Sequence, residues 1–425
     1  MIYIVILVIF ILTALGVPIA FSLGSMSFMF FISKGFPLPV IVQRLFSATQ
    51  SFTFLAVAFF ILSGSIMLQS GIAKRLVDFV NSFFGHFFGG LGLVTIVTNM
   101  IMAGVSGSSV ADAAAVGSLM IPGMKKSGYP ASFSAAINAC SSVVGIIIPP
   151  SSTMIIIAWL TQLSVGKLFV AGIIPGILFG LTFFVITIFV SKKMNYPRGK
   201  AFKVNRAVKS FKNSFFALLL PLLILGPIII GIATATEVSA LAVLFAIIIG
   251  SFIYRSLSIN NIIFALEDAV YSTSAIMLTL CSASMFSWML IYERIPDKIT
   301  RIMLSMGLSN NSMILMVIIV LFIAGTVLQL APNLFVTLPI VFPILVNVVG
   351  MDPVHAAILV LCALAVGLFT PPIGSTLFVS CNLAKVDIGD AVKDVIPYFL
   401  GSIVVVLLVA YVPFLSLGMV NIFFK

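Results

Sequence analysis

Two short stretches of the sequence combine adjacent prolines with hydroxyl side chains in strongly apolar surroundings. They are "IIIPPSSTMII" at 146–156 and "GLFTPPIGSTLFV" at 367–379. Proline has no N–H and its ring clashes with the preceding turn, so carbonyls just before each pair lose their helical partners and can hold a cation. Beyond each pair a new half-helix begins, and its unpaired N–H groups and positive dipole end favour an anion. These breaks single out Gly145, Pro149, Ser152 and Thr153 in the first stretch and Gly367, Thr370, Pro371, Ser375 and Thr376 in the second.

A further polar segment, "AGVSGSSVAD" at 103–112, interrupts another apolar run. Its Asp112 is the acidic residue that falls at predicted membrane depth, where an ionisable group costs at least about 2.5 to 3.5 kcal/mol and is functional by default. Asp112 either binds or balances a Na⁺ ion, or it braces a hairpin tip by accepting backbone N–H bonds. Small residues that expose oxygen atoms suit a hard cation such as Na⁺. The candidate ligands are Ser106, Gly107, Ser108 and Ser109, with Gly325, Gln329 and Asn333 as neutral counterparts in a second interrupted run.

Helices in a membrane have to position these groups. The chain has 61% hydrophobic and 8% charged residues and a mean hydropathy of +1.30, far from a soluble domain. Long apolar runs dominate and the alternation of barrel strands is absent, which predicts an all-α polytopic membrane protein. The predicted spans are 1–15, 18–33, 50–71, 166–190, 213–231, 236–254, 269–292 and 396–418, with broken helices at 131–161 and 354–384. Re-entrant hairpins are predicted at 88–123 and 309–349, and interfacial helices at 72–86 and 293–305.

The basic residues indicate how these helices are oriented. If both hairpins return to the side from which they came, most of the 22 Lys and Arg residues lie on one face, including those of the basic segment 191–212. That face is predicted to be cytoplasmic, so both termini are predicted to be periplasmic. The segment 191–212 is interpreted as a solvated link beside anionic lipid, and binding to nucleic acid is not predicted.

The two halves of the chain repeat each other. Residues 1–190 and 213–425 enter the membrane from opposite sides in this topology, on either side of the segment 191–212. Their proline landmarks agree, because the interval from Pro122 to Pro149 nearly equals the interval from Pro343 to Pro371. The sequence therefore predicts an inverted-topology repeat, with a transport site where the two broken helices meet.

Catalytic and transition-metal chemistry is not predicted. The four cysteines lie in apolar stretches without CxxC spacing, and each is interpreted as a small buried hydrophobe. His86 and His355 have no Cys, Asp or Glu at metal spacing, and there is no P-loop. The chain is therefore predicted not to be an enzyme, and Na⁺ is its only predicted metal ion.

Several motifs together resemble one family. They are "GHFFGGLGLVTIVTNMIMAGVSGSSVADAAAVGSLMIPGMKKSGYP" (85–130), "GIIIPPSS" (145–152), "KLFVAGIIPG" (167–176) and "VGLFTPPIGSTLFV" (366–379). The combination of "SGSSVAD" with two "PP" breaks is similar to the large membrane subunit of tripartite ATP-independent periplasmic (TRAP) transporters, over nearly the whole chain. The resemblance implies a Na⁺-coupled secondary importer of the elevator type in the bacterial inner membrane. It also implies two partners, a separate small four-helix membrane subunit and a periplasmic substrate-binding protein.

The resemblance further implies an organic acid as substrate, such as a C4-dicarboxylate or a sialic acid, with sialic acid as the first expectation. In sialic-acid members, the positions matching Ser108, Asp112, Thr153 and Gln329 belong to the region of the transport site. The family often has an acidic residue where this chain has Gln329. The expected substrate ligands are Ser108, Ser109, Ser152, Thr153, Gln329, Ser375 and Thr376. Two alternatives remain: a self-sufficient Na⁺/dicarboxylate symporter without a binding protein, and a channel-like or structural subunit.

Overall fold

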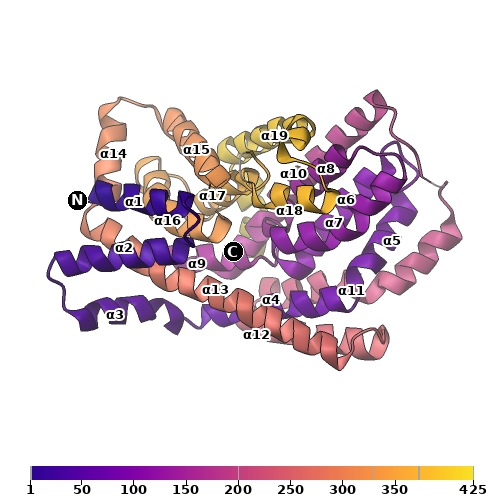
Figure 1. Cartoon of the computed structure of the whole chain (residues 1–425), viewed down its shortest axis with the longest axis horizontal. Coiled ribbons are helices and arrows are strands. Elements are labelled where there is room, and N and C mark those ends of the chain that lie inside the picture. The colour runs from indigo at the N-terminus through magenta and orange to yellow at the C-terminus, as the bar shows by residue number, and fades with distance from the viewer. Residues whose placement is uncertain (1, 200, 328, 372–373, 425) are drawn as a thin grey trace.

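The computed structural model describes residues 2–199, 201–327, 329–371 and 374–424 (Figure 1). These residues are mainly helical and form no β-strand, although Phe88 and Arg198 make an isolated antiparallel bridge. The helices of the first half are α1 (Ile2–Ala14), α2 (Ile19–Ser33), α3 (Leu38–Ser47), α4 (Thr53–Gln69), α5 (Ile72–Phe84), α6 (Gly90–Ser106), α7 (Ser109–Lys126), α8 (Ala131–Ser142), α9 (Ser152–Thr161) and α10 (Val165–Lys193).

The second half repeats this pattern of long, paired and interrupted helices. Its helices are α11 (Val204–Ile230), α12 (Ala235–Ile248), α13 (Ile259–Tyr292), α14 (Ile295–Ser305), α15 (Asn310–Val327), α16 (Leu330–Pro343), α17 (Pro353–Gly367), α18 (Ser375–Ala384), α19 (Ile388–Tyr411) and α20 (Phe414–Phe423). Short π-helical turns extend α12 to Ile253 and α16 to Val348. The all-α architecture expected from the sequence is confirmed.

Length and composition suit a membrane. Among the described residues, six helical segments are long and apolar enough to cross it individually: Val165–Lys193, Val204–Ile230, Ala235–Ile253, Ile259–Tyr292, Leu330–Val348 and Ile388–Tyr411. The pair α4 and α5 would make a seventh but bends by 69°. The half-helices α9 and α18 have 10 residues each, so each spans about 15 Å, half of the hydrocarbon core.

Several boundaries differ from those expected. The helix α3 was not predicted, because its stretch "LPVIVQRLFS" is short and contains a proline and an arginine. The link predicted at 191–212 is shorter, since α11 already begins at Val204 and carries its lysines in its first turns. The last predicted span, 396–418, is two helices, α19 and α20, because Pro413 separates them.

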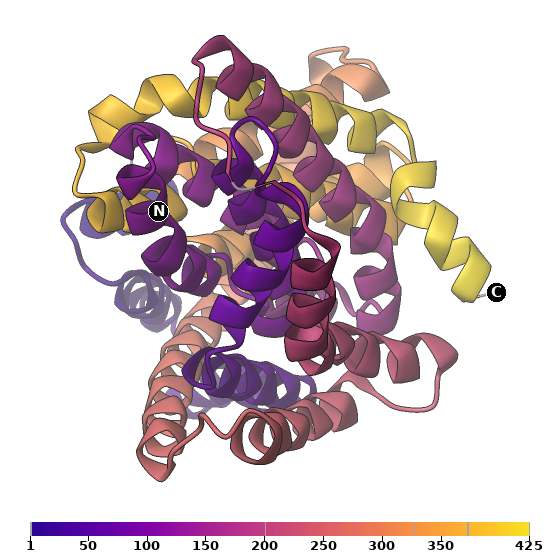
Figure 2. The same cartoon turned by 90° about the vertical axis from the view of Figure 1, so that its right-hand side faces the viewer.

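Two groups of helices can be distinguished by their contacts. The first hairpin, α6 and α7, packs against α8, and the second, α15 and α16, packs against α17. The helices α2, α4, α12 and α13 pack against one another, as α5 does against α11, and we call these six helices the scaffold, although α5 packs equally against α6 of the first hairpin. The halves are interleaved, because α18 of the second half lies against α7 and α8 of the first (Figure 1). Figure 2 shows the same mixing of early and late segments, with α20 and the C-terminus at the edge.

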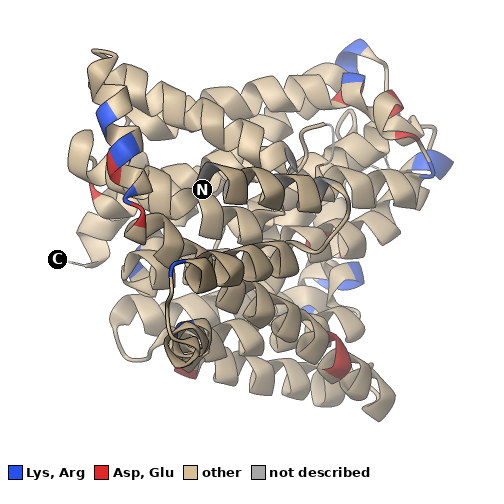
Figure 3. Cartoon of the chain, turned by 60° about the vertical axis from the view of Figure 1, so that its left-hand side comes forward, with Lys and Arg blue, Asp and Glu red and all other residues tan. Residues whose placement is uncertain are grey.

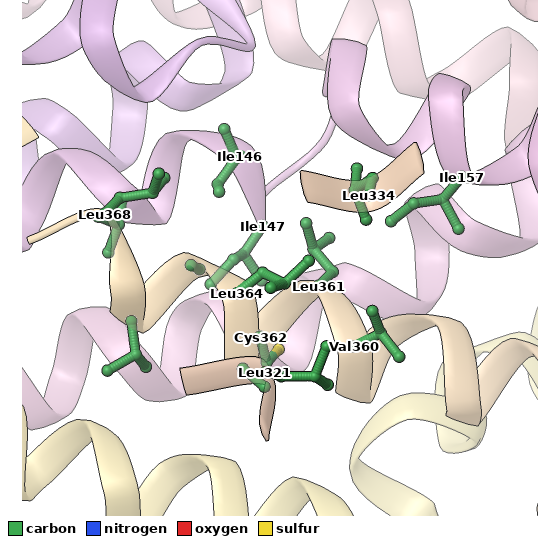
Figure 4. Packing of buried hydrophobic residues seen from close by; sticks show 14 of the residues in the cluster. Ile146, Ile147, Ile157, Leu321, Leu334, Val360, Leu361, Cys362, Leu364 and Leu368 are labelled. Atoms are coloured by element: carbon green, nitrogen blue, oxygen red, sulfur yellow. The ribbon is translucent and has the colours of Figure 1, made fainter. Parts of the chain in front are cut away.

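The helix α17 lies at the centre of the core, with every residue from Val354 to Gly367 buried. Its Leu361 and Leu364 lie close to Ile147 of the first broken helix, while Leu321 comes from the second hairpin (Figure 4). All four cysteines are free and buried, as expected of small hydrophobes. This dry packing keeps the helix breaks away from lipid, where unpaired backbone would be unstable.

Charged residues gather mainly toward two opposite ends of the molecule, and the helices between them carry few (Figure 3). One end carries Lys34, Glu293 and Lys298, with the Lys34 ammonium 3.0 Å from the Glu293 carboxylate. This distribution leaves an apolar band around the middle of the structure, as a membrane requires.

Candidate functional site

A cavity of about 430 Å³ lies where four helices begin. Its wall contains the first residues of α7, α9, α16 and α18, which come from both hairpins and both broken helices. The N-terminus of a helix carries unpaired N–H groups and a partial positive charge, so four such ends facing one cavity favour an anion. The lining residues are Gly107, Ser108, Ser109, Val110, Ile146, Ser152, Thr153, Ile156, Ile276, Gln329, Leu330, Ala331, Pro332, Leu368, Ser375, Phe378 and Val379.

Six of the seven expected substrate ligands lie in this wall, namely Ser108, Ser109, Ser152, Thr153, Gln329 and Ser375. The seventh, Thr376, is fully buried and lies outside the wall. Its hydroxyl is within donor distance of the carbonyls of Ala139 (3.1 Å) and Leu368 (2.9 Å), so it ties α18 to α8. The structure thus gathers the predicted polar residues around one cavity and gives Thr376 a bracing position.

Side-chain caps shape the helix starts at this cavity. The Ser108 side chain accepts a hydrogen bond from the N–H of Ala111 at the start of α7, and Ser151 accepts from Met154 at the start of α9. Each cap leaves other N–H groups of the first turn free for a ligand. The hydroxyl of Ser152 donates to the carbonyl of Gly107 at 3.0 Å, which links the first hairpin tip to the first helix break.

The tip of the first hairpin requires a glycine. Gly107 has a φ of +61°, and a Cβ there would lie 2.8 Å from the carbonyl oxygen of Pro150. Both the left-handed backbone and the close contact exclude a larger residue without strain. Only a glycine therefore lets this tip reach the helix break.

Asp112 lies beside this tip and is fully buried. Its Oδ1 accepts a hydrogen bond of 2.6 Å from the Ser106 hydroxyl, whereas Oδ2 has no hydrogen-bond partner among the described residues. A Cβ added to Gly145 would collide with that Oδ2, so the carboxylate lies directly against the first helix break. Pro149 has no N–H to offer the Gly145 carbonyl, four residues before it. A buried carboxylate oxygen without a partner among the described residues, next to a helix break, is the kind of oxygen ligand that fits a hard cation.

The second hairpin has a related but neutral arrangement. Asn333 follows the cap residue Gln329 by four positions, as Asp112 follows Ser108. The N–H of Asn333 donates to the Gln329 carbonyl at 3.0 Å, and the N–H of Asp112 donates to the Ser108 carbonyl at the same distance. Asn333 is fully buried, and neither its Oδ1 nor its Nδ2 finds a partner in the described part of the chain. The inverted repeat therefore has a carboxylate in one half and an amide at the matching position in the other.

Gly325 and Gly367 bring the second hairpin and the second helix break into backbone contact. A Cβ on Gly325 would lie 3.0 Å from the Cα of Gly367, and a Cβ on Gly367 would overlap the Gly325 backbone. The Gly367 carbonyl accepts a hydrogen bond from the N–H of Thr370, whose hydroxyl donates to the carbonyl of Val366. Pro371 lies in the turn that follows, and Pro372 lies outside the described residues.

The apolar part of the cavity wall was not predicted from the sequence. Ile146, Ile156 and Phe378 line it beside the hydroxyls, and Ile276 adds a residue from the scaffold helix α13. In a chain so rich in isoleucine and phenylalanine, no local signal distinguishes these four from the rest of the core.

Two buried asparagines near the site make interhelical hydrogen bonds. Asn99 donates to the Ser141 hydroxyl at 2.7 Å. Asn138 donates to the Ala113 carbonyl and to the Ser380 hydroxyl, both at 2.9 Å, and so joins α8 to α7 and α18. These bonds fix the helices that carry Asp112 and the cavity hydroxyls.

A solved structure supports the architecture. The YdaH transporter of Alcanivorax borkumensis, described as having an unusual topology, matches with a TM-score of 0.67 over 90% of this chain and 89% of that chain. The sequence identity is 14%, so this likeness concerns the fold alone.

Sequence relatives identify the family. The chain is 36% identical over 378 residues to the C4-dicarboxylate TRAP transporter large permease protein DctM of Pseudomonas aeruginosa, a match covering 89% of this chain and 88% of that protein. It is 33% identical to the 2,3-diketo-L-gulonate TRAP transporter large permease protein YiaN of Escherichia coli, over 94% of each. It is 35% identical to the isethionate TRAP transporter permease protein DctMQ of Oleidesulfovibrio alaskensis, covering 94% of this chain but 63% of that longer protein.

The family model described as "Tripartite ATP-independent periplasmic transporter, DctM component" matches residues 6–415, almost the entire chain. The chain therefore belongs to the DctM family and is the large membrane subunit of a tripartite ATP-independent periplasmic transporter, not an enzyme.

Proposed function

We propose that this subunit imports a small organic anion together with Na⁺ across the inner membrane. The observation that carries the proposal is the 430 Å³ cavity, in which four helix N-termini and six polar side chains from both halves of the chain converge. Helix N-termini favour an anionic group, and hydroxyls from both helix breaks can donate hydrogen bonds to a carboxylate or sulfonate.

Na⁺ would be held next to this cavity by the first hairpin and first break, through Asp112, Ser106, Ser108 and the carbonyls near Gly145 and Pro149. A second ion would be held by the neutral set of the second half, which consists of Gly325, Gln329, Gly367, Thr370 and Pro371. The buried Asp112 carboxylate has one oxygen that finds no partner in the described part of the chain, which is unfavourable unless a cation approaches it. Bound Na⁺ supplies that positive charge and fixes the hairpin tip, so the anion site is completed only in its presence.

The movement we propose is an elevator. The hairpins and broken helices would move together as one body, because α18 and Asn138 join them, while the scaffold helices stay in place. Among the described residues of the cavity wall, Ile276 alone comes from the scaffold helix α13, so most of the site would travel with the moving body.

Membership in the family implies a periplasmic binding protein and a small membrane subunit as partners. The proteins named above are described as permeases for a C4-dicarboxylate, 2,3-diketo-L-gulonate and isethionate. All three are small anions that carry a carboxylate or sulfonate, which agrees with a cavity built from N–H groups and hydroxyls. We therefore propose a substrate of this class, with sialic acid retained as one acid to test.

Uptake into liposomes tests the proposal. The chain is reconstituted with its small subunit, and the cognate binding protein is added outside with a radiolabelled acid chosen by binding measurements on that protein. Accumulation is expected with an inward Na⁺ gradient and is expected to stop when K⁺ replaces Na⁺ or when the binding protein is omitted. Uptake that continues under both omissions rejects the mechanism, and uptake that needs Na⁺ but no binding protein favours a self-sufficient symporter.

A further inference from the structure

A second cavity, of about 440 Å³, lies between the scaffold helix α13, the helices α3 and α14, and the helices α9 and α16. The helix α3 packs against α13. The chain contains two tryptophans, Trp159 and Trp288, and both line this cavity together with Arg44. None of these three residues lines the first cavity.

Arg44 is held over a rigid aromatic wall. Its guanidinium carbon lies 5.2 Å from the centre of the Trp288 ring, within the range of a cation–π contact. Trp288 in turn stacks on Phe31 at 3.9 Å and meets Phe36 edge-on at 5.2 Å. Among the described residues, no carboxylate lies within 4.0 Å of Arg44. An arginine positioned in this way keeps its planar set of N–H donors free for an anion from outside the chain.

Two hydroxyls add to the polar side of the cavity. Ser284 makes no hydrogen bond with the part of the chain that the structure describes, and Ser287 reaches the Phe335 carbonyl only at the limit of 3.5 Å. A guanidinium and two available hydroxyls between indole rings match a small organic anion with a carboxylate or sulfonate group.

The same helices line both cavities, one after the other. On α13, Ile276 lines the first cavity, whereas Ser284 and Trp288 line the second, about 12 to 18 Å further along the helix. On α9, the order is Thr153 and then Trp159. If the first cavity moves along α13 in the proposed elevator motion, the second cavity lies on its path. The second cavity is on the side of the molecule that carries Lys34 and Lys298.

We propose that this second cavity binds the transported anion through Arg44, as a station on the path between the binding protein and the first cavity. The inference rests on the proposed function for the identity of the anion. Arg44 would attract the anion, the indole rings would cover its apolar part, and the hydroxyls of α13 would replace water around its charged group.

Tryptophan fluorescence tests the proposal directly, because both reporters line the cavity. The complex with the small subunit is placed in nanodiscs of phosphatidylcholine and titrated with succinate, gluconate and isethionate. At least one anion is expected to change the fluorescence saturably, and a complex carrying both Trp159→Phe and Trp288→Phe supplies the background from the small subunit. The variant Arg44→Gln is expected to weaken the response about 10- to 100-fold, whereas Arg301→Gln, on the exposed side of α14, is expected to leave it unchanged.

Further arms separate the possible causes of a signal. A response that survives in Arg44→Gln but vanishes when Ser152 and Thr153 are both changed to valine would come from the first cavity and would overturn the proposal. The proposal would also be overturned if phosphatidylglycerol in the nanodisc saturated the signal and free anions did not displace it, because the occupant would then be a lipid headgroup. Uptake is measured in the same preparation. Na⁺-dependent uptake without any tryptophan response defeats this inference alone, whereas a lack of uptake for every acid defeats the proposed function.

Discussion

Replacing Asp112 by asparagine separates its two possible roles, cation ligand and hairpin brace. The amide keeps the shape of the side chain and can still accept the 2.6 Å hydrogen bond from Ser106. It removes the negative charge of Oδ2, the oxygen without a partner. We therefore expect Asp112→Asn to leave the fold intact and to abolish the part of the Na⁺ response that comes from the site at Asp112.

The magnitudes follow from where the carboxylate lies. A unit charge and a cation about 4 Å apart attract each other by about 4 kcal/mol at an effective dielectric constant of 20, so losing this attraction lowers Na⁺ affinity by up to about a thousandfold. Without Na⁺, removing the negative charge is expected to favour the folded state. An ionised aspartate at membrane depth costs about 2.5 to 3.5 kcal/mol, so the sodium-free variant should be at least as stable as the parent.

Thermal unfolding of the complex in a series from K⁺ to Na⁺ at constant ionic strength measures both effects. The site at Asp112 is expected to stabilise the parent by about 2.7 kcal/mol when Na⁺ reaches one hundred times the dissociation constant of that site, whereas the variant should lose this gain and keep only the response of the neutral set in the second half. Asp78→Asn, on the exposed side of α5, is the matched control and should behave like the parent. A parental Na⁺ response in Asp112→Asn refutes the role in binding Na⁺, and a large loss of stability without Na⁺ identifies the residue as a brace.

Three further changes test other parts of the structure. Gly367→Ala would press a methyl group into the Gly325 backbone and should cost about 1 to 3 kcal/mol in thermal unfolding, while Gly123→Ala, where a Cβ meets nothing within 4 Å, should not destabilise the complex. Asn138→Leu removes both bonds from the Asn138 amide and should cost about 1 to 3 kcal/mol, visible as a lower melting temperature; a neutral result would contradict the bracing role. The hydrogen bond from Lys34 lowers the pKa of Glu293 below its ordinary value near 4.5. The ionised Glu293 therefore stabilises the folded state fully above pH 4.5, and this stabilisation is lost as the pH falls through the lowered pKa. The free energy of unfolding of Glu293→Gln, derived from melting curves, should therefore be lower than that of the parent by at most about 1 kcal/mol at pH 7, and the two should become equal in acid.

The polar part of the site could be predicted because polar residues are rare in this chain. Pro149, Pro371 and Asp112 stand out against apolar neighbours, and spacing was enough to place them at helix breaks and a hairpin tip. The gathering of the neighbouring hydroxyls around one cavity needed the three-dimensional structure, since Ser108 and Ser375 come from different halves.

Other features had no signal of this kind. Ile276 lines the cavity because α13 passes it, and nothing in an apolar helix says which turn faces a neighbour. The helix α3 is only 10 residues long, and α11 begins among lysines that hydropathy assigns to a loop. The gathering of Arg44 and both tryptophans around the second cavity likewise depends on how α3, α9 and α13 pack, which local sequence does not encode.

The interlocking of α8 with α18 has a consequence for biosynthesis. Asn138 donates to Ser380, a residue 242 positions later in the chain. At about 5 to 20 residues per second, a ribosome needs about 12 to 50 seconds to make the intervening chain. During that delay the nascent first half lies in the bilayer with one polar contact of α8 still missing, so a newly inserted subunit must wait for its last third before its centre can close.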